Sequence, residues 1–542
     1  MTAVPAVLTL DHLTIGLPPG ADRALALDDV SLALHAGEVL CLVGESGSGK
    51  SVAASAVMRL LPAALRIQAG SVGFEGQDLA ALPESAMRRI RGAGIGMVFQ
   101  EPMTALNPLL TIGRQIGETF RTHTALGRRE IAQRTLQLLD DVRLPNPAAA
   151  QRAYPHQLSG GQRQRVMIAM ALALDPRVLI ADEPTTALDV TTQAQILRLI
   201  RDLQRRKGTA VLFITHDFGV VADIADRVAV MQHGRVVETG TATEVLGWPQ
   251  HAYTRTLLAA VPDLIPRTTT APGRPAGTVL AIEGLHKTYR SGARWLRNRR
   301  VTQALDGVGL QLPRGSTLGI VGESGSGKST LARCIVRLLE TDAGTIRLDG
   351  ADLAALSRRA WRQQAGRVQM VFQDPYSSLD PRRRVGDLVA QGPIAHGVPR
   401  AQAHERSREL FALVGLDPAS VHRYPHEFSG GQRQRIGLAR ALALEPQVLV
   451  ADEPVSALDV SVQAQVLALL ADLRRRLGLS IVFITHDLRV AAQVCDRIAV
   501  MHQGRVVEEA ATADLFAAPR HAYTQALLAA VPGRDWQRPT FS

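Results

Sequence analysis

Cysteine and long apolar runs are both scarce in this chain of 542 residues, and each scarcity excludes a class of protein. The three cysteines, Cys41, Cys334 and Cys495, lie far apart and form no C-x-x-C pair. We therefore expect buried thiols in a reducing compartment rather than a disulfide scaffold. No apolar stretch reaches the roughly 18 residues of a membrane span, and the N-terminus lacks a signal-peptide pattern. We expect the chain to remain in the cytosol.

Lysine is almost as rare, which gives weight to its few positions. The net charge is +11, yet Lys50, Lys207, Lys287 and Lys328 are the only lysines among 61 basic residues. A basic balance of this kind fits nucleic acid, an anionic membrane surface or simply an arginine-rich surface. Two of the four lysines stand in a repeated glycine-rich segment, where a compact ammonium group can reach the β- and γ-phosphates of a nucleotide.

That segment is the octapeptide Gly-Glu-Ser-Gly-Ser-Gly-Lys-Ser, which occurs at residues 44–51 and again at 322–329. Each copy follows a short apolar run, as in a strand–GxxxxGK[ST]–helix phosphate loop. The glycines let backbone N–H groups curl around phosphate oxygens at a helix N-terminus. Lys50 and Lys328 would neutralise charge, while the Ser51 and Ser329 hydroxyls suit Mg²⁺. The sequence therefore predicts two nucleotide sites.

The repetition covers almost the whole chain. From Ser159 and Ser429 onward, the two copies are separated by a constant offset of 270 positions. Between them, residues 263–277 hold three prolines, two glycines and no apolar period, which predicts a linker. As a flexible coil this linker would span roughly 20 Å and keep the halves at about millimolar effective concentration. We predict one domain over residues 1–262 and a second over 278–542.

The pattern within each half alternates strands and helices, which predicts an α/β fold with a mainly parallel sheet. Short apolar runs predict buried strands at residues 178–181, 210–214, 448–451 and 480–484. Residues 102–157 predict a helical insertion outside the sheet. Helical stripes that would pack on the sheet are formed by Ile196, Leu199, Ile200 and Leu203, and again by Val466, Leu469, Leu470 and Leu473.

Paired carboxylates follow matching strands in the two halves. Asp182 and Asp452 end apolar runs, where a carboxylate is well placed to hold Mg²⁺. The adjacent Glu183 and Glu453 can orient and polarise an attacking water. Because the Asp-Glu pair recurs after the same apolar tetrad, we interpret it as functional rather than as a solvated turn.

Amide and imidazole side chains also end apolar runs. Gln100 and Gln373 can ligate Mg²⁺ or water and sense a γ-phosphate. His216 and His486 recur beside an aspartate, which favours a γ-phosphate contact over a purely structural role.

A second candidate anion site occurs in each half, at Leu158-Ser-Gly-Gly-Gln162 and Phe428-Ser-Gly-Gly-Gln432. Serine is a good N-cap, and the glycines leave first-turn N–H groups open at the positive end of a helix. Each half already has a phosphate loop for its own nucleotide. The extra helix end makes sense if it grips the nucleotide held by the other half.

The motifs of each half and their order resemble those of ATP-binding-cassette (ABC) ATPases: phosphate loop, glutamine, LSGGQ-type segment, Asp-Glu pair and histidine. The resemblance extends over essentially the entire chain. The resemblance implies two tandem P-loop NTPase domains, each a mainly parallel sheet core with an antiparallel β part and a helical subdomain. It also implies ATP and Mg²⁺ as cofactors and a head-to-tail pair of cassettes that sandwiches ATP at two interfaces. Neither half lacks a motif residue, so we expect both to hydrolyse ATP.

The predicted site residues follow from that resemblance. The catalytic residues are Glu183, Glu453, His216 and His486. The Mg²⁺ site residues, which also contact nucleotide, are Ser51, Gln100 and Asp182 in one half and Ser329, Gln373 and Asp452 in the other. The remaining nucleotide contacts are Gly44, Glu45, Ser46, Gly47, Ser48, Gly49, Lys50, Ser159, Gly160, Gly161, Gln162, Tyr289, Gly322, Glu323, Ser324, Gly325, Ser326, Gly327, Lys328, Thr330, Ser429, Gly430, Gly431 and Gln432.

The halves differ at one predicted contact. Family members often stack an aromatic residue on adenine just before the phosphate loop. Tyr289 fits this role in the second half, whereas alignment of Val7 with Val279 places Leu17 there in the first. We therefore expect the first site to bind adenine more weakly.

The segments Pro249–Pro262 and Pro519–Pro532 resemble the ends of ATPase subunits from oligopeptide, dipeptide and nickel importers. This resemblance implies a fused motor that powers import of peptides or related small solutes at the cytoplasmic face of the inner membrane. Two separate permease subunits and a periplasmic or lipid-anchored binding protein would be its partners. No cysteine follows Cys495, so we expect no iron–sulfur centre. Oligopeptides, dipeptides, glutathione, antibiotic peptides and nickel all remain open as cargo.

A rival class is the soluble double-cassette ATPase that acts on ribosomes or nucleic acid, which the +11 charge makes worth weighing. Those proteins usually join their cassettes by a long, charged, helical connector, whereas residues 263–277 are short and proline-rich. DNA-repair cassette proteins need zinc-binding cysteine clusters or long coiled-coil insertions, and this sequence has neither. We expect no nucleic-acid partner.

Overall fold

The computed structural model describes residues 5–21, 23–100, 105–186, 188–267, 277–291, 300–374, 378–456 and 458–539. The chain forms two compact units. The first unit comprises residues 1–188, 192–261 and 532–542, and the second comprises residues 189–191 and 262–531. Most of the predicted linker, residues 268–276, lies outside the described part of the chain.

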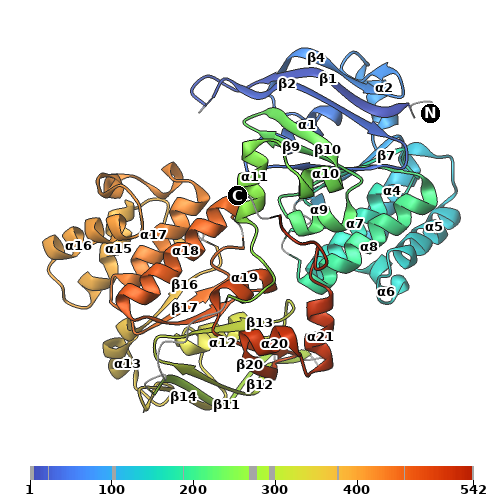
Figure 1. The fold of residues 1–542 in the computed structure, drawn as a ribbon. Helices are drawn as coiled ribbons and strands as arrows, with labels where there is room; N and C mark the ends of the chain where they lie inside the picture. Colours follow the sequence, from blue (N-terminus) through green and yellow to red (C-terminus); the bar gives the residue numbers. More distant parts are fainter. Residues whose placement is uncertain are drawn as a thin grey trace. The chain divides into compact units, whose positions relative to one another are not determined.

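Each unit combines a parallel-rich sheet, a smaller antiparallel sheet and a helical part (Figure 1). The strands of the first unit are β1 (Ala6–Gly16), β2 (Leu25–His35), β3 (Val39–Val43), β4 (Arg66–Phe74), β5 (Gln77–Asp78), β6 (Ile95–Val98), β7 (Val178–Asp182), β8 (Ala210–Ile214), β9 (Arg227–Gln232) and β10 (Arg235–Thr241). Its helices are α1 (Lys50–Val57), α2 (Glu84–Ile90), α4 (Ile112–His123), α5 (Arg128–Asp141), α6 (Pro147–Arg152), η1 (Pro155–Gln157), α7 (Gly160–Ala171), α8 (Val190–Lys207), α9 (Phe218–Ile224), α10 (Ala242–Gly247) and α11 (Ala252–Ala260).

The second unit repeats this order of elements. Its strands are β11 (Thr278–Ser291), β12 (Arg300–Pro313), β13 (Thr317–Val321), β14 (Ala343–Leu348), β15 (Ala351–Asp352), β16 (Val368–Val371), β17 (Val448–Asp452), β18 (Ser480–Ile484), β19 (Arg497–His502) and β20 (Arg505–Ala511). Its helices are α12 (Lys328–Ile335), α13 (Arg358–Gln364), η2 (Ala365–Arg367), α15 (Val385–Ala395), α16 (Arg400–Leu413), η3 (Pro418–His422), η4 (Pro425–Glu427), α17 (Gly430–Leu442), α18 (Val460–Leu477), α19 (Leu488–Val494), α20 (Thr512–Ala517) and α21 (Ala522–Ala529).

The six-stranded sheet sets the position of the functional residues. Its order in the first unit is β10-β9-β3-β8-β7-β6, and β3 runs parallel to both β8 and β9. β6, β7 and β8 are parallel as well, so their carboxyl ends share one edge of the sheet with that of β3. In open α/β sheets this edge is where ligands bind. The predicted strands at 178–181 and 210–214, and their counterparts in the second unit, are confirmed.

The antiparallel and helical parts also agree with expectation. The sheet β2-β1-β4-β5 is antiparallel and shares one hydrophobic core with β3 and α1. The predicted insertion outside the sheet is helical: it contains α4, α5 and α6. Figure 1 shows these helices on the opposite side of the six-stranded sheet from β1 and β2.

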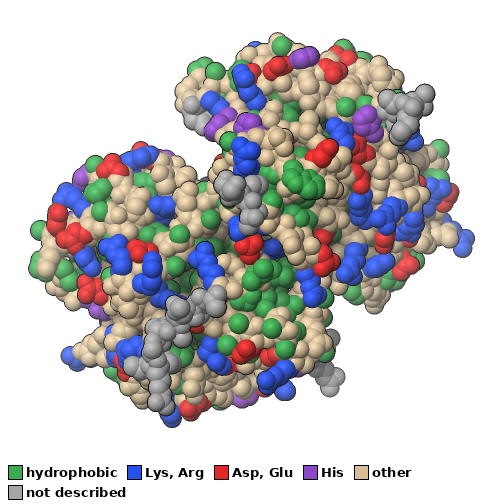
Figure 2. Space-filling model, viewed as in Figure 1, with side chains coloured by type: hydrophobic (Ala, Val, Ile, Leu, Met, Phe, Trp, Pro, Cys, Tyr) green, Lys and Arg blue, Asp and Glu red, His purple; other side chains and the backbone are tan. Residues whose placement is uncertain are grey.

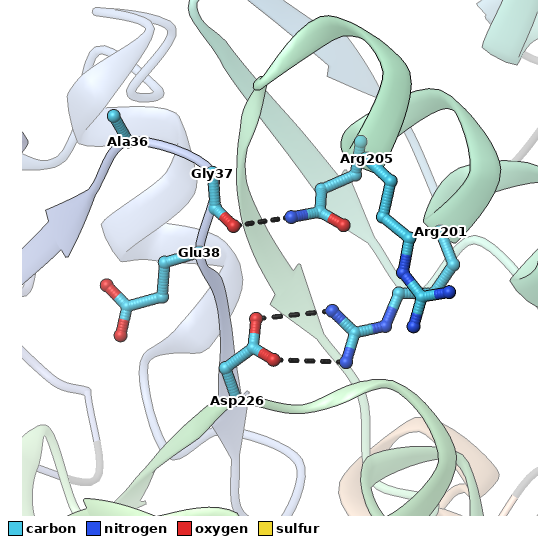
Figure 3. Close-up of a pocket in the computed structure, with 7 residues that line it drawn as sticks. Ala36, Gly37, Glu38, Arg201, Arg205 and Asp226 are labelled. Atoms are coloured by element: carbon cyan, nitrogen blue, oxygen red, sulfur yellow. Dashed lines mark hydrogen bonds and ion pairs between the residues drawn. The ribbon is translucent and has the colours of Figure 1, made fainter.

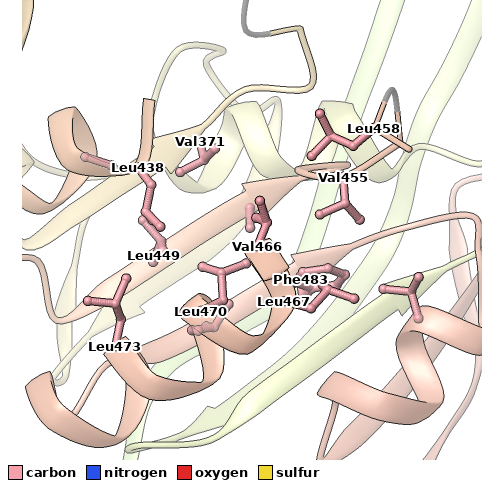
Figure 4. Close-up of a cluster of buried hydrophobic side chains, with 14 of the residues drawn as sticks. Val371, Leu438, Leu449, Val455, Leu458, Val466, Leu467, Leu470, Leu473 and Phe483 are labelled. Carbon is pink, nitrogen blue, oxygen red and sulfur yellow. The ribbon is translucent and has the colours of Figure 1, made fainter. Parts of the chain in front are cut away.

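Helix–sheet packing forms the core of the second unit. Figure 4 shows side chains of α18 directed at the strands β17 and β18. Leu470 and Leu473 are fully or almost fully buried there, in the same hydrophobic cluster as Phe483. Burying a leucine side chain contributes about 1.5–3 kcal/mol. The helical stripe predicted in the first unit is confirmed too, because all four of its residues are at most 5% exposed.

The cysteines behave as expected from composition. Cys41, Cys334 and Cys495 are free and buried, and burial raises the pKa of the Cys334 thiol to about 11. On the face drawn in Figure 2, basic side chains are interspersed with acidic ones over both units. Many arginines form exposed ion pairs such as Arg134–Glu130, at 3.3 Å, which stabilise a protein little. The excess positive charge on this face is therefore carried mainly by solvated side chains.

Candidate functional site

The phosphate-loop octapeptide of each unit connects the central strand to a helix. In the first unit it leaves β3 at Gly44 and enters α1 at Lys50. Gly49 has φ 106°, a left-handed conformation that favours glycine. A Cβ atom on Gly44 would lie 2.2 Å from the carbonyl oxygen of Met231, so the loop needs glycine there as well. The second unit repeats both features at Gly322 and Gly327.

The lysine of each loop folds back over the loop. Lys50 is buried, and its Nζ donates to the carbonyl oxygens of Gly44 and Glu45 at 2.7 and 2.8 Å. Lys328 makes the same two bonds to Gly322 and Glu323 at the same distances. Burial lowers the pKa of the Lys328 ammonium, although nearby carboxylates act in the opposite direction. The ammonium therefore lies inside the loop that was predicted to receive phosphate.

A buried carboxylate lies beside the serine that ends each loop. The Ser51 hydroxyl donates to Asp182 Oδ1 at 3.1 Å, and that of Ser329 donates to Asp452 Oδ1 at 3.2 Å. Burial raises the pKa of Asp182 to about 6 despite the serine hydrogen bond, and burial raises the pKa of Asp452 as well. A hydroxyl and a carboxylate are oxygen ligands of the kind that Mg²⁺ takes.

This pair fits a magnesium ion that keeps other ligands. Among the described residues, no group of three or more His, Cys, Asp or Glu could hold a metal ion. Mg²⁺ is usually bound by one or two protein groups together with waters and substrate phosphates, so two donors are sufficient. Gln100, also predicted as a metal ligand, donates a hydrogen bond to Glu183 in this structure.

The predicted catalytic glutamate is the centre of a small polar cluster. Glu183 Oε2 accepts hydrogen bonds from Gln100 Nε2 at 3.1 Å and from the Thr186 hydroxyl at 2.9 Å. Nδ1 of His216 lies 3.3 Å from the other carboxylate oxygen, Oε1. The structure thus brings together the glutamine, the glutamate and the histidine that follow three different strands.

The second unit has the same cluster. Glu453 Oε2 accepts from Gln373 Nε2 at 2.8 Å and lies 3.3 Å from His486 Nδ1. Burial by itself would lower the pKa of His486, but the hydrogen bond and charge of Glu453 outweigh it, so this pKa is raised. The pKa of Glu453 is lowered by the same histidine, against the effect of burial.

The first cluster shows the same electrostatic balance. Burial would raise the pKa of Glu183, but the hydrogen bond and charge of His216, with help from Thr186 and Lys50, lower it to about 2. A carboxylate with this pKa is a weak base. Whatever draws His216 away from Glu183 would raise the carboxylate's proton affinity.

Both glutamates also have an unusual backbone. Their φ angles are 46° at Glu183 and 47° at Glu453, in the left-handed region that residues with a side chain rarely adopt. The N–H group of Glu183 donates to the Ile214 carbonyl at 3.0 Å, and that of Glu453 donates to the Ile484 carbonyl at 2.9 Å. Strain of this kind, about 1–3 kcal/mol, concentrates at functional positions.

The LSGGQ-type segments begin helices, as predicted. Ser159 is the N-cap of α7: its Oγ accepts from the Gln162 N–H, and the Gln162 side chain accepts from the Ser159 N–H. A Cβ on Gly161 would lie 2.5 Å from Thr192 Cγ2, so this glycine allows close packing on α8. Ser429 caps α17 in the same way in the second unit. The use of each helix end by the opposite nucleotide stays a prediction.

The predicted adenine contact lies next to the phosphate-loop helix. Tyr289 is on β11, and its hydroxyl lies 3.5 Å from Oγ1 of Thr330 in the first turn of α12. Equivalent strand pairings, Leu8 with Leu34 and Leu280 with Leu312, support the alignment that gives Leu17 this position in the first unit.

Two contacts of these sites were missed by sequence reasoning. The Thr186 hydroxyl on Glu183 is one of them. The other joins each phosphate loop to the importer-type segment near the end of its unit, Pro249–Pro262 or Pro519–Pro532, called the tail below. The Glu45 N–H donates to the Tyr253 hydroxyl at 3.3 Å, and the Glu323 N–H donates to the Tyr523 hydroxyl at 3.1 Å. The matched His-Ala-Tyr-Thr segments were the available signal.

One hollow of the first unit lies away from these groups. It has a volume of about 370 Å³ and lies between the start of β3 and the C-terminal half of α8 (Figure 3). Arg201 forms two hydrogen bonds to Asp226, at 3.0 and 3.2 Å, and Gln204 donates to the Gly37 carbonyl. Because the phosphate loop follows the other end of β3, this hollow is a strand's length from it. Its paired lining fastens α8 to the sheet.

Comparison with known proteins agrees with this geometry. The family model described as "ABC transporter" matches residues 27–186 and 305–456, which include both phosphate loops and both Asp-Glu pairs. The chain belongs to the ABC transporter family. A second model, "Oligopeptide/dipeptide transporter, C-terminal region", matches residues 237–288 and 507–540, which include both tails.

Similar curated proteins match the cassette pair over nearly its full length. The peptidoglycan transport ATP-binding protein YejF of Agrobacterium fabrum is 49% identical over 98% of this chain and 97% of its own length. The glutathione import ATP-binding protein GsiA of Salmonella paratyphi A is 46% identical over 98% of this chain and 90% of its own. GsiA of Escherichia coli O157:H7 is 46% identical over 97% and 89%.

These relatives confirm the double-cassette ABC fold and the ATPase activity. The chain is an ATP-hydrolysing subunit that powers import, and the comparisons give no support to action on ribosomes or nucleic acid. Permease partners in the membrane follow from this role. None of the helices in the described ranges has the length and apolar character needed to span a bilayer.

Proposed function

We propose that this ABC ATPase drives the import of short peptides or peptide-containing solutes. It acts at the cytoplasmic face of the inner membrane, through two separate permease subunits supplied by a substrate-binding protein. The observation that carries the proposal is that each complete ATPase unit is followed by an oligopeptide/dipeptide-type tail. The relatives named for peptidoglycan transport and glutathione import support a peptide-like cargo, because both compounds contain peptide bonds.

In the proposed cycle, the phosphate loop receives the triphosphate of ATP. Lys50 exchanges its bonds to the Gly44 and Glu45 carbonyls for phosphate oxygens, which its compact ammonium group suits. Ser51 and Asp182 would hold Mg²⁺, which would neutralise charge on the phosphates. Their hydrogen bond at 3.1 Å already brings the two oxygen donors together.

The glutamate then has to be released to act as a base. Gln100 and His216 both contact the Glu183 carboxylate, and both are suited to turn toward a γ-phosphate. When they do, the Glu183 pKa rises from its low value of about 2 and the carboxylate can take a proton from the attacking water. Glu453, Gln373 and His486 would act in the same way in the second unit.

The helices α7 and α17, which begin at the LSGGQ-type segments, complete the proposal. Ser429, Gly431 and Gln432 would contact the nucleotide bound at Lys50, and Ser159, Gly161 and Gln162 the nucleotide bound at Lys328. The support is local: both segments form capped helix N-termini, which favour anions. Binding of two ATP molecules would then close the pair of cassettes, and hydrolysis would reopen it.

Uptake in a strain lacking this chain tests the proposed cargo. Labelled oligopeptides, dipeptides, a peptidoglycan-derived peptide, glutathione and Ni²⁺ are compared after complementation with the wild-type chain or with a Glu183→Gln, Glu453→Gln chain. We expect peptide uptake to return only with the wild type, and the chain to copurify with permease subunits. Uptake of Ni²⁺ alone, or stable association with ribosomes in place of permeases, would contradict the proposal.

A further inference from the structure

The tail of each unit touches the phosphate loop through one tyrosine hydroxyl. The Tyr253 hydroxyl accepts a hydrogen bond from the Glu45 N–H at 3.3 Å and lies 3.3 Å from the Glu45 carboxylate, to which it can donate. In the second unit, the Tyr523 hydroxyl accepts from the Glu323 N–H at 3.1 Å. The same contact thus occurs twice, between segments about 200 residues apart in the sequence.

The start of each tail helix is held firmly enough to fix that hydroxyl. The Nδ1 atom of His251 accepts from the Tyr253 N–H at 3.2 Å and so caps α11. The N–H groups of Gln250 and His251 both donate to the Glu238 carboxylate of β10, at 2.6 and 3.2 Å. Farther along the helix, Leu257 and Leu258 are buried.

The second tail is held by equivalent groups. His521 caps α21 through the Tyr523 N–H at 3.1 Å, and Glu508 of β20 accepts from the Arg520 and His521 N–H groups at 2.8 and 3.0 Å. The Tyr523 ring also lies against the His502 ring, with centroids 4.0 Å apart. Burial raises the pKa of Tyr523 to about 12, so its hydroxyl keeps its proton at neutral pH.

The residue that each tail tyrosine contacts, Glu45 or Glu323, is the second residue of the octapeptide. Its N–H group faces the tail tyrosine, and its carbonyl oxygen accepts from the loop lysine at 2.8 Å in both units. The tyrosine therefore fixes the orientation of the peptide group that follows Gly44 or Gly322. A loop already fixed in shape loses less conformational freedom when it binds phosphate.

We propose that Tyr253 and Tyr523 are positioning residues for the phosphate loops, and that through them the docking of each tail raises the ATP affinity of its own unit. This inference rests on the proposed nucleotide role of the loops. Coupling between two binding events is reciprocal, so bound ATP must also hold the tail more firmly against its unit. A partner that pulled the tail away would promote nucleotide release.

The test removes only the hydroxyl, with Tyr253→Phe in a full chain that also carries Glu453→Gln, so that hydrolysis is read from the first site. We expect the KM for ATP to rise about 3- to 10-fold, the effect of one ordinary hydrogen bond. The kcat should stay within about twofold, because the cluster around Glu183 is untouched. A purely structural role would not separate KM from kcat in this way.

The matched control is Thr256→Val, which removes a hydroxyl from the same helix. Thr256 is exposed, and its hydroxyl donates to the Ala252 carbonyl of its own helix at 3.0 Å, not to the phosphate loop. We expect its KM to equal that of the parent chain. A Tyr253→Phe chain with the KM of this control, or with a reduced kcat at unchanged KM, would overturn the proposal.

Hydrogen exchange tests the reciprocal effect in the wild-type chain. ATP should slow exchange of the amides of residues 252–260 in the wild type and Thr256→Val, and should slow it less in Tyr253→Phe. Equal protection in all three chains would contradict the coupling.

Lys50→Ala in the Glu453→Gln chain separates the nucleotide role of the loop from the positioning role of the tyrosine. Hydrolysis should disappear in this chain. If it persists, the nucleotide-site assignment fails, and the tyrosine proposal fails with it.

Discussion

Replacement of Asp182 by Asn should stabilise the nucleotide-free first unit while abolishing Mg²⁺-dependent hydrolysis there. Asp182 is 6% exposed, and burial raises its pKa from an ordinary 3.8 to about 6 although Ser51 donates a hydrogen bond to it. A pKa difference of about two corresponds to roughly 3 kcal/mol. Asparagine keeps the oxygen that accepts from Ser51 but carries no charge. The free energy of unfolding should therefore rise by up to about 3 kcal/mol at neutral pH.

The sign of the pH dependence follows from the raised pKa. Between about pH 4 and pH 6, the folded state binds more protons at Asp182 than the unfolded state does, so stability falls as pH rises through this window. Above it the penalty is complete and constant. The asparagine chain lacks this loss, so its advantage should be largest at neutral pH and small near pH 4.

Thermal unfolding of the full chain without nucleotide measures the effect. For a unit of this size, a change of about 3 kcal/mol corresponds to roughly 6–12 °C in the Tm at which the first unit unfolds. Asp140→Asn, a change at an exposed position of α5, is the matched control and should shift the Tm little. An Asp182→Asn chain that is no more stable at neutral pH, or is equally stabilised near pH 4, would refute the reasoning.

Three further predictions concern the chemistry. The Glu183→Gln, Glu453→Gln chain should bind ATP but release phosphate at least ~100-fold more slowly; near-normal phosphate release would exclude the base role. In the Glu453→Gln chain, Ser429→Ala should slow hydrolysis roughly tenfold, whereas Ser159→Ala, which loses the same N-cap, should not; equal effects would contradict the assigned pairing. Leu17→Tyr should tighten ATP binding at the first site about 2- to 10-fold by stacking on adenine, as titration with ATP would show; unchanged affinity would count against the adenine contact.

Much of the fold could be predicted because the signals are local. The strand at residues 210–214 is a short apolar run, and its polar follower His216 lies at the edge where parallel strands end. The phosphate loop is specified by its own glycines, as at Gly49. Such features depend on residues that are neighbours in the sequence, so pattern and chemistry point to the same place.

Other features depend on segments that meet only after folding. The repeated His-Ala-Tyr-Thr segment marks Tyr253 but does not indicate that its hydroxyl reaches Glu45, because a tail helix with this pattern is equally well explained by packing. The low pKa of Glu183 requires His216, and the need for glycine at position 161 comes from Thr192. These contacts are set by the distance between elements, which residue spacing does not encode.

The left-handed backbone at Glu183 and Glu453 limits how the proposed catalytic carboxylate can respond to ATP. Its peptide N–H is bonded to the neighbouring strand, and the Glu183 carbonyl accepts from the Thr186 N–H at 3.2 Å. Only torsions about the side-chain bonds remain free to change. Rotations of this kind take picoseconds to nanoseconds, whereas collective domain motions take microseconds to milliseconds. Release of the glutamate side chain to act as a base would then be fast, and the rate of transport would be set by the movement of whole cassettes.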